Sequence, residues 1–306
     1  MIRAEGLTKY YESQCVVEDV SFEIQDNEIV GFLGLNGAGK TTVLRMLAGI
    51  LSPSAGSIQI DDQDLLVDPL NLRWRIGFLP ERPPVYEDMQ VENYLEFAAQ
   101  LRGKSADRIE EVITLTDLGS VRQKRVGTLS HGFRQRLGIA QAIVHDPALV
   151  VLDEPINGLD PVQIKEMRDL ITRLKERHTV LVSSHILTEI SQTCDRILVL
   201  QEGKLVFNGT EQELSSQMNV DSKEVLAVIL GERTQIETVL QDSDFVSKWS
   251  IQNEIEGGAQ VHVSLNGVSS EALAAAVIKA GLGLRSLSPV KTQLESLFIR
   301  LMGTEA

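Results

Sequence analysis

Short apolar runs alternate with longer amphipathic segments over residues 1–215. This alternation is typical of an α/β domain with a largely parallel sheet. Three of the apolar runs, at 28–34, 148–154 and 179–185, predict buried strands whose carboxyl ends turn polar. Because ligands of open α/β sheets bind at the carboxyl ends of the strands, we expect these three ends to meet at one site.

The pattern changes between and after these strands. Two amphipathic segments, at 91–103 and 106–119, predict helices of an inserted lobe that spans about 89–147, and the segment 196–209 predicts a hairpin. Residues 216–306 predict a second, small α+β domain after a polar linker. Its elements are expected in the order strand, helix, strand, strand, helix, strand, helix, as in a ferredoxin-like fold with one added helix. Their ranges are 224–230, 234–241, 248–255, 259–265, 269–281, 284–289 and 292–303.

Composition limits the partners of the chain. Lys and Arg number 29 against 43 Asp and Glu, a formal net charge of −14. This balance argues against a binder of duplex nucleic acid and against attachment to anionic lipid by charge alone. Cys15 and Cys194 form neither a disulfide framework nor a metal-ligand spacing, and neither a signal-peptide pattern nor an apolar run of membrane-spanning length is found. We therefore expect a cytoplasmic protein that reaches a membrane only through another protein.

The stretch GLNGAGKT, residues 34–41, fits the phosphate-binding pattern GxxxxGK[ST] and lies between a predicted strand and a predicted helix. Its glycines allow backbone N–H groups to surround phosphate oxygens, Lys40 is placed to reach the outer phosphates, and the Thr41 hydroxyl is a candidate Mg²⁺ ligand. The alternative is a chance Gly-rich turn, which would not need a strand before it and a helix after it. The expected phosphate-binding residues are Gly34, Leu35, Asn36, Gly37, Ala38, Gly39, Lys40, Thr41 and Thr42.

Polar residues at the ends of the other two strands supply candidate catalytic groups. Asp153 is placed to hold Mg²⁺, and Glu154 is placed to polarise an attacking water. His185 is placed to donate a hydrogen bond to a terminal phosphate. Paired acids after a strand are also common as solvated loop residues, and a lone histidine is more often a structural hydrogen-bonding residue, so the interpretation of these residues depends on the phosphate loop.

A helix predicted over 128–144 begins unusually. Ser130 is a good N-cap, but His131, Arg134 and Arg136 occupy the first turns. A helix N-terminus already carries about half a positive charge, so added cations there indicate a bound anion. Backbone N–H groups and Ser130 are the expected ligands of that anion, while Arg134 and Arg136 are expected to pair with acids of their own domain.

Together these motifs resemble those of an ATP-binding cassette (ABC) ATPase. GLNGAGKT, LSHGF, LVVLDEP, GLDP and SSH occur in that order, at separations similar to those of the family. The resemblance implies an α/β P-loop NTPase cassette with a RecA-like core, an antiparallel β subdomain and a helical subdomain. It also implies nucleotide contacts by Ser130 and Gly132 of the signature motif, Asp160 of the D-loop, the switch histidine His185, and Tyr11, or Tyr10 as the alternative, stacked on adenine.

Three positions depart from the common family pattern. Glu81 stands where most cassettes have Gln, which makes it a further candidate metal ligand beside Thr41 and Asp153. His131 replaces the usual first Gly of the signature, and Phe133 replaces its Gln. These changes resemble the ABC-2 exporter branch, including gliding-motility-type ATPases. We expect Phe133 to pack into the core rather than to contact nucleotide.

The C-terminal domain also resembles an extension found on that branch. Its acids are dispersed, it holds no Cys, and His262 lies on an alternating strand where a surface or hydrogen-bonded histidine is the simpler interpretation. We expect a structural or regulatory domain. A small-molecule sensor of the ACT type shares such a topology and is the alternative.

The resemblance implies an exporter ATPase that binds ATP and Mg²⁺ and works as a head-to-tail homodimer on a separate membrane permease. Each site would take the signature helix from the other chain, and the helical lobe with the Glu81 loop would carry the groove for a permease helix. The alternatives are an importer ATPase and a soluble ABC protein acting on nucleic acid or the ribosome. The latter usually carries a coiled-coil insertion, a second cassette or a basic patch, none of which is found here. A small-molecule P-loop kinase would need neither LSHGF nor GLDP.

Overall fold

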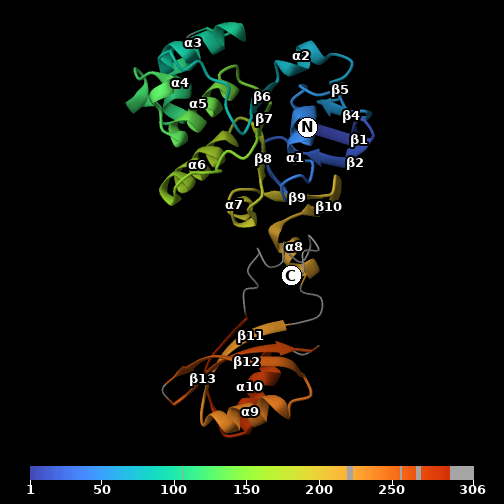
Figure 1. Ribbon diagram of the computed structural model, residues 1–306, viewed down its shortest axis with the longest axis vertical. Helices are drawn as coiled ribbons and strands as arrows, with labels where there is room; N and C mark the ends of the chain where they lie inside the picture. Colours follow the sequence, from blue (N-terminus) through green and yellow to red (C-terminus); the bar gives the residue numbers. More distant parts are fainter. Residues whose placement is uncertain (106, 219–222, 256, 267–269, 290–306) are drawn as a thin grey trace. The chain divides into compact units, whose positions relative to one another are not determined.

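The computed structural model describes all residues except 106, 219–222, 256, 267–269 and 290–306 (Figure 1). The chain divides into two compact units, residues 1–211 and 212–306. The helix predicted over 292–303 lies outside the described residues. No helix in the described part of the chain is long and apolar enough to cross a membrane.

A six-stranded sheet forms the centre of the first unit, in the order β10-β9-β3-β8-β7-β6. All neighbours pair in parallel except the edge strand β10. The prediction that three buried strands end at one edge is confirmed, because β3, β8 and β7 are neighbours in this sheet. The bounds are β3 (Ile29–Leu33), β6 (Ile76–Leu79), β7 (Leu149–Leu152), β8 (Thr179–Ser184), β9 (Arg196–Gln201) and β10 (Lys204–Gly209), so the predicted hairpin is also confirmed.

A second, antiparallel sheet has the order β2-β1-β4-β5. It comprises β1 (Ile2–Tyr11), β2 (Gln14–Ile24), β4 (Ala55–Ile60) and β5 (Gln63–Asp64). The apolar face of helix α1 (Lys40–Leu47) shares one buried cluster with residues of both sheets. This cluster holds the start of α1, and with it the end of the phosphate loop, firmly between the sheets.

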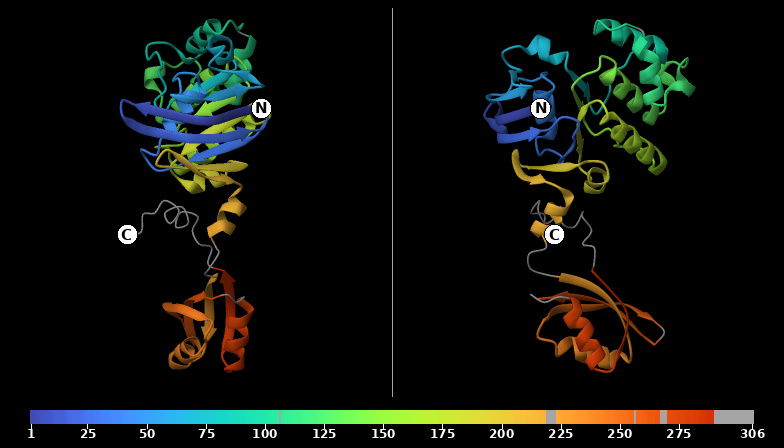
Figure 2. Two further views of the ribbon diagram at one scale, coloured as in Figure 1. Left: turned by 90° about the vertical axis from the view of Figure 1, so that its right-hand side faces the viewer. Right: turned by 180° about the vertical axis from the view of Figure 1, so that it is seen from behind.

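Other helices cover the opposite face of the central sheet, but Leu72 of α2 belongs to the same buried cluster as α1. In Figure 1, α5, α6 and α7 lie on one side of β6, β7 and β8, and α1 lies on the other side; Figure 2 shows the same layers from behind. Helices α3 and α4 pack on α5 and form the helical lobe. The bounds are α2 (Pro69–Arg73), α3 (Val91–Leu101), α4 (Asp107–Leu115), η1 (Gly119–Val121), η2 (Val126–Thr128), α5 (His131–Ile143), α6 (Pro161–Leu174) and α7 (Leu187–Ser191).

The second unit contains an antiparallel sheet in the order β12-β13-β11-β14. Alternate residues of the strands pack against helices α9 and α10 in one buried cluster. The predicted order strand, helix, strand, strand, helix, strand is confirmed, and His262 lies half-buried on β13. The bounds are β11 (Lys223–Leu230), α9 (Arg233–Gln241), β12 (Val246–Ile255), β13 (Gly258–Leu265), α10 (Ser270–Lys279) and β14 (Gly283–Pro289), preceded by α8 (Glu211–Met218).

Two buried histidines lie just before strands of the central sheet. His145 has Nε2 3.1 Å from the carbonyl oxygen of Ile76, and His178 has Nδ1 2.7 Å from that of Pro147. A carbonyl only accepts, so these ring nitrogens donate and neutral rings satisfy both contacts. Burial lowers the pKa of His145 to about 4, and burial also lowers the pKa of His178.

The pKa of His145 therefore makes stability depend on pH. The unfolded chain takes up this proton near the ordinary histidine pKa and the folded chain only near 4, so stability falls as the pH drops through that window. His145→Gln keeps an N–H donor but does not titrate. In urea unfolding at pH 7 and pH 4.5, we expect the unmodified chain to lose about 2 kcal/mol more than the variant. Equal losses in the two proteins would contradict the buried, neutral state of His145.

Candidate nucleotide-binding site

The loop between β3 and α1 contains the residues predicted to bind phosphate. Gly37 and Gly39 have φ angles of +86° and +100°, which favour glycine. A Cβ atom at Gly39 would lie 2.8 Å from the Val16 carbonyl oxygen, so a side chain there would collide with the backbone of β2. A Cβ atom at Gly37 would have nothing within 4 Å, so the loop faces open space at this point. The loop is shaped to surround a ligand with backbone rather than with side chains.

Lys40 crosses the mouth of this loop. Its side chain is buried, and its Nζ donates to the Gly34 carbonyl oxygen at 2.6 Å. The same ammonium lies 3.4 Å from Oε1 of Glu154. Lys40 and Glu154 are therefore direct neighbours although they lie far apart in the sequence. The Lys40 ammonium lies beside the loop that is expected to bind phosphate.

Asp153 and Glu154 follow β7 and are arranged by Ser183 of β8. The Ser183 hydroxyl donates to Oδ1 of Asp153 at 2.7 Å and accepts the Glu154 N–H at 2.9 Å. Glu154 has φ +50°, a backbone conformation that non-glycine residues rarely adopt and that this hydrogen bond holds in place. Burial raises the pKa of Asp153, and the charges of Glu154 and Glu81 add to that rise although Ser183 and Thr41 donate to the carboxylate.

His185 completes the group on the Glu154 side. Its Nδ1 lies 2.9 Å from Oε2 of Glu154. Glu154 therefore has one oxygen beside Lys40 and the other beside His185. A carboxylate held at both oxygens has a defined orientation, which a group that polarises a water needs.

Lys40, Glu154 and His185 line one pocket of about 500 Å³, whereas Asp153 is not among its lining residues. Val16 and Asn157 also line it, although the sequence pattern did not indicate either; Asn157 lies three residues after Glu154, and Val16 carries no motif at all. Of the predicted phosphate-binding residues, Gly34 and Ala38 belong to the loop but do not line the pocket. The lining residues are Val16, Leu35, Asn36, Gly37, Gly39, Lys40, Thr41, Thr42, Glu81, Glu154, Asn157 and His185.

The oxygen donors beside the loop fit Mg²⁺. This cation takes oxygen ligands and is usually held by one or two carboxylates together with substrate phosphates. The Thr41 hydroxyl donates to the Asp153 carboxylate, and the charge of Glu81 acts on the same carboxylate. In the described part of the chain, no cluster of three or more His, Cys, Asp or Glu side chains forms a metal site by itself.

Tyr11 is not among the residues that line this pocket. It lies at the end of β1, is 45% exposed, and has the Lys9 ammonium 5.7 Å from its ring centroid. Tyr10 is 50% exposed and does not line the pocket either. The stacking role of these two tyrosines stays a prediction.

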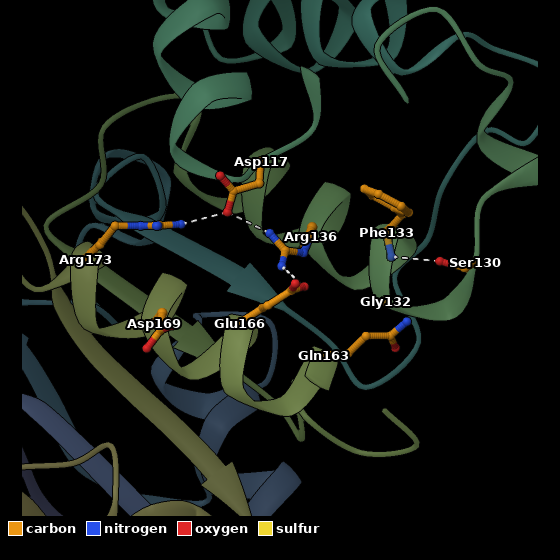
Figure 3. A pocket seen from close by; sticks show the side chains of 9 residues that line it. All are labelled: Asp117, Ser130, Gly132, Phe133, Arg136, Gln163, Glu166, Asp169 and Arg173. Atoms are coloured by element: carbon orange, nitrogen blue, oxygen red, sulfur yellow. Dashed lines mark hydrogen bonds and ion pairs between the residues drawn. The ribbon is translucent and has the colours of Figure 1, made fainter. Parts of the chain in front are cut away.

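The signature helix α5 borders a different pocket, of about 350 Å³ (Figure 3). The Ser130 hydroxyl accepts the Phe133 N–H at 3.4 Å, so Ser130 is the N-cap. Ser130 and Gly132 do not line the pocket that holds Lys40 and Glu154. Asp160 is the N-cap of α6, where its carboxylate accepts the N–H groups of residues 162 and 163 at 3.0 and 2.9 Å.

Two expectations about the start of α5 have different outcomes. Arg134 lies 3.3 Å from Glu87, and Arg136 lies 2.9 Å from Asp117 and 2.8 Å from Glu166, so the pairing of both arginines within their own domain is confirmed. The expectation that Phe133 packs into the core is wrong. Phe133 is half-buried and lines the pocket of about 350 Å³ beside α5, because it lies in the first turn of the helix on the side that faces this pocket.

Comparison with known proteins gives the same class. A protein-family model described as "ABC transporter" matches residues 17–157. The uncharacterized ABC transporter ATP-binding protein YhcH of Bacillus subtilis (strain 168) is 37% identical over 252 residues, which cover 81% of each chain. The bacitracin transport ATP-binding protein BcrA of Bacillus licheniformis is 33% identical over 306 residues, covering 99% of this chain and 97% of the relative.

Solved structures agree with these relatives. An ATP-binding subunit of an ABC transporter has a TM-score of 0.65 and 30% identity, covering 72% of this chain and 94% of that chain. A dimeric bacterial ABC transporter cassette has a TM-score of 0.63 at 23% identity, covering 69% and 98%, and shares the fold. The chain belongs to the family of ABC transporter ATP-binding proteins and carries the ATPase domain of that family.

The position of Lys40 leads to a prediction about ATP binding. Lys40→Ala removes the only side-chain cation that lines the loop mouth in the described part of the chain, so we expect affinity for a fluorescent ATP analogue to fall by more than about tenfold. Lys279→Ala, in helix α10 of the second unit, is the matched control and should bind as the unmodified chain does. Unchanged affinity in Lys40→Ala would remove the phosphate-loop assignment.

Proposed function

We propose that this chain is the ATP-hydrolysing subunit of an ABC-2 type exporter and that it works as a head-to-tail homodimer on a separate membrane permease. One observation carries the dimer. Ser130 and Gly132 border one pocket, while Lys40, Glu154 and His185 line another. If the signature residues and the phosphate-loop residues act on the same γ-phosphate, the signature residues must come from a second copy of the chain.

The phosphate-loop pocket would perform the chemistry. The N–H groups of residues 35–42 and the Lys40 ammonium bind the β- and γ-phosphates. Binding draws the ammonium from Glu154 to the phosphates, and the released carboxylate oxygen orients a water for attack in line with the γ-phosphate. His185 keeps its hold on the other Glu154 oxygen and faces the developing charge.

Mg²⁺ would be held by Thr41, Asp153 and Glu81. When bound, the cation supplies charge stabilisation to the phosphate oxygens. The raised pKa of Asp153 belongs to a buried carboxylate beside two other acids, and a cation at this place would favour its ionised form.

The N-terminus of α5 would contact the γ-phosphate of ATP bound to the other chain. Its arginines are already paired with acids of their own chain, so the anion is left to the backbone N–H groups, Ser130 and the helix dipole. ATP then links two chains, and hydrolysis weakens the link.

A permease of the cytoplasmic membrane is the proposed partner, and its helix would dock on the helical lobe and the Glu81 loop. Large apolar side chains are exposed on or beside this region at Tyr86, Leu101 and Trp74, whose ring centroid lies 5.5 Å from the Arg102 guanidinium, and they support a protein contact there. Export is supported by relatives named for bacitracin transport that align over nearly the whole chain, C-terminal unit included. That unit is proposed to be structural or regulatory.

Replacing Glu154 separates binding from turnover. Glu154→Gln keeps the size of the side chain but removes the charge that orients water, so we expect ATP binding with turnover at least about 100-fold slower. The trapped ATP should shift the protein to a dimer in size-exclusion chromatography. Glu237→Gln in the second unit is the control, and a Glu154→Gln chain that remains monomeric with ATP would count against the dimer.

Mixing two inactive variants tests the shared site. Ser130→Arg blocks the signature, and Lys40→Ala disables the phosphate loop. Heterodimers of these chains keep one intact composite site, so we expect the mixture to be at least about threefold more active than either variant alone. A mixture no more active than its components would argue against action of the signature in trans.

A further inference from the structure

The first two turns of the signature helix lie against residues 157–166 of the same chain, the loop after Glu154 and the start of α6. Three contacts join them: His131 with Asn157, Gly132 with Gln163, and Arg136 with Glu166. We call these contacts the signature clamp. Figure 3 shows α5 and α6 side by side with Gln163 and Glu166 facing the signature.

His131 forms the contact nearest to the nucleotide pocket. Its Nε2 lies 3.0 Å from the Asn157 carbonyl oxygen, and because a carbonyl only accepts, the ring N–H donates. The N–H of Asn157 in turn donates to the Glu154 carbonyl oxygen at 3.2 Å. Asn157 also lines the pocket with Glu154. One residue therefore joins the signature to the backbone of the chain's own nucleotide site.

Gly132 allows the close approach of the two segments. A Cβ atom at this position would lie 2.9 Å from Oε1 and 3.0 Å from Cδ of Gln163. Any larger residue would have to displace the Gln163 side chain. The first turn of α5 and the start of α6 therefore lie close together at this point.

Arg136 fixes the second turn. Its side chain is 8% exposed, and its guanidinium donates to Asp117, to Glu166 and to the Thr116 carbonyl oxygen at 2.9, 2.8 and 3.2 Å. Burial would raise the pKa of Asp117, but hydrogen bonds from Arg173 and Arg136 hold it below its ordinary value. A buried cation shared by two acids fixes geometry, because removing it takes one of two arginine partners from Asp117 and breaks the ion pair of Glu166 with α5.

We infer that His131 and Arg136 are positioning residues, which fix the signature helix to the loop of the chain's own nucleotide site. The signature offered to a partner's ATP then moves together with Asn157, so the two sites of the dimer are linked through each chain. This inference rests on the proposed function, since the signature acts on a partner only if the chain dimerises.

The test again mixes two variant chains. A variant that only misplaces the signature should regain activity with a partner that has an intact signature, whereas a misfolded variant should not. Arg136→Met should bind a fluorescent ATP analogue within about twofold of the unmodified chain, since its own phosphate loop is intact, while its ATPase activity falls by more than about tenfold. Mixed with Lys40→Ala, it should regain at least about threefold in activity. Arg134→Met, on the same helix but outside the signature clamp, is the control and should keep its activity within about twofold.

His131 gives an independent variant that does not risk the fold, because its side chain is exposed. His131→Ala should lower kcat by about three- to tenfold, as for one lost hydrogen bond, and leave nucleotide affinity unchanged. His131→Gln, which still carries an N–H donor, should recover part of this loss.

Rescue of Ser130→Arg by Lys40→Ala, without rescue of Arg136→Met, would overturn the inference and leave the proposed function intact. Loss of nucleotide affinity in the His131→Ala chain would overturn it as well. No rescue in any mixture would remove the dimer and the inference with it.

Discussion

The parallel pairing of β3, β8 and β7 is the constraint on which the site depends. Leu33 pairs with Ser184 and Leu152 with Val182, so the three strands end at one edge of the sheet. The residues that follow are the phosphate loop, the acids Asp153 and Glu154, and His185. All three strands are fully buried, so a shift of register would expose apolar side chains as well as separate the catalytic groups.

Buried hydrogen bonds then set the chemistry within this frame. Ser183 contacts both Asp153 and Glu154, and Lys40 and His185 contact the two oxygens of Glu154. The left-handed backbone of Glu154 turns the chain away from β7 directly after Asp153. The two adjacent acids can therefore act differently, one beneath the phosphate loop and the other facing the pocket.

Arg134 and Arg136 near the start of α5 pair with acids of their own chain, and Ser130 and Gly132 do not line the pocket that holds Lys40 and Glu154. This arrangement suits a site that is shared between two chains. Internal pairing makes the helix rigid, and the backbone N–H groups are left for a ligand supplied by another copy.

Much of this arrangement follows from local sequence. Strand and helix patterns gave the sheet of β3, β7 and β8, the hairpin and the order of elements in the second unit, because buried strands and amphipathic helices differ in period. The phosphate loop follows from its glycines and Lys40.

Contacts between distant segments could not be found in this way. Val16 lines the pocket only because β2 passes beside Gly39, and no local pattern indicates this. Phe133 was expected in the core because it is apolar, but its place in the first turn of α5 leaves it beside a pocket. The partner of Arg136 on α6 depends on how two helices pack, which spacing along the chain does not determine.

The central claim is that one ATPase site is built from two chains. The most direct test is the specific ATPase activity at saturating ATP, measured over protein concentrations from the nanomolar to the micromolar range. A shared site predicts that activity per chain rises with protein concentration and then levels off as dimers become the main species. Constant activity per chain down to concentrations at which sedimentation shows only monomer would contradict the account.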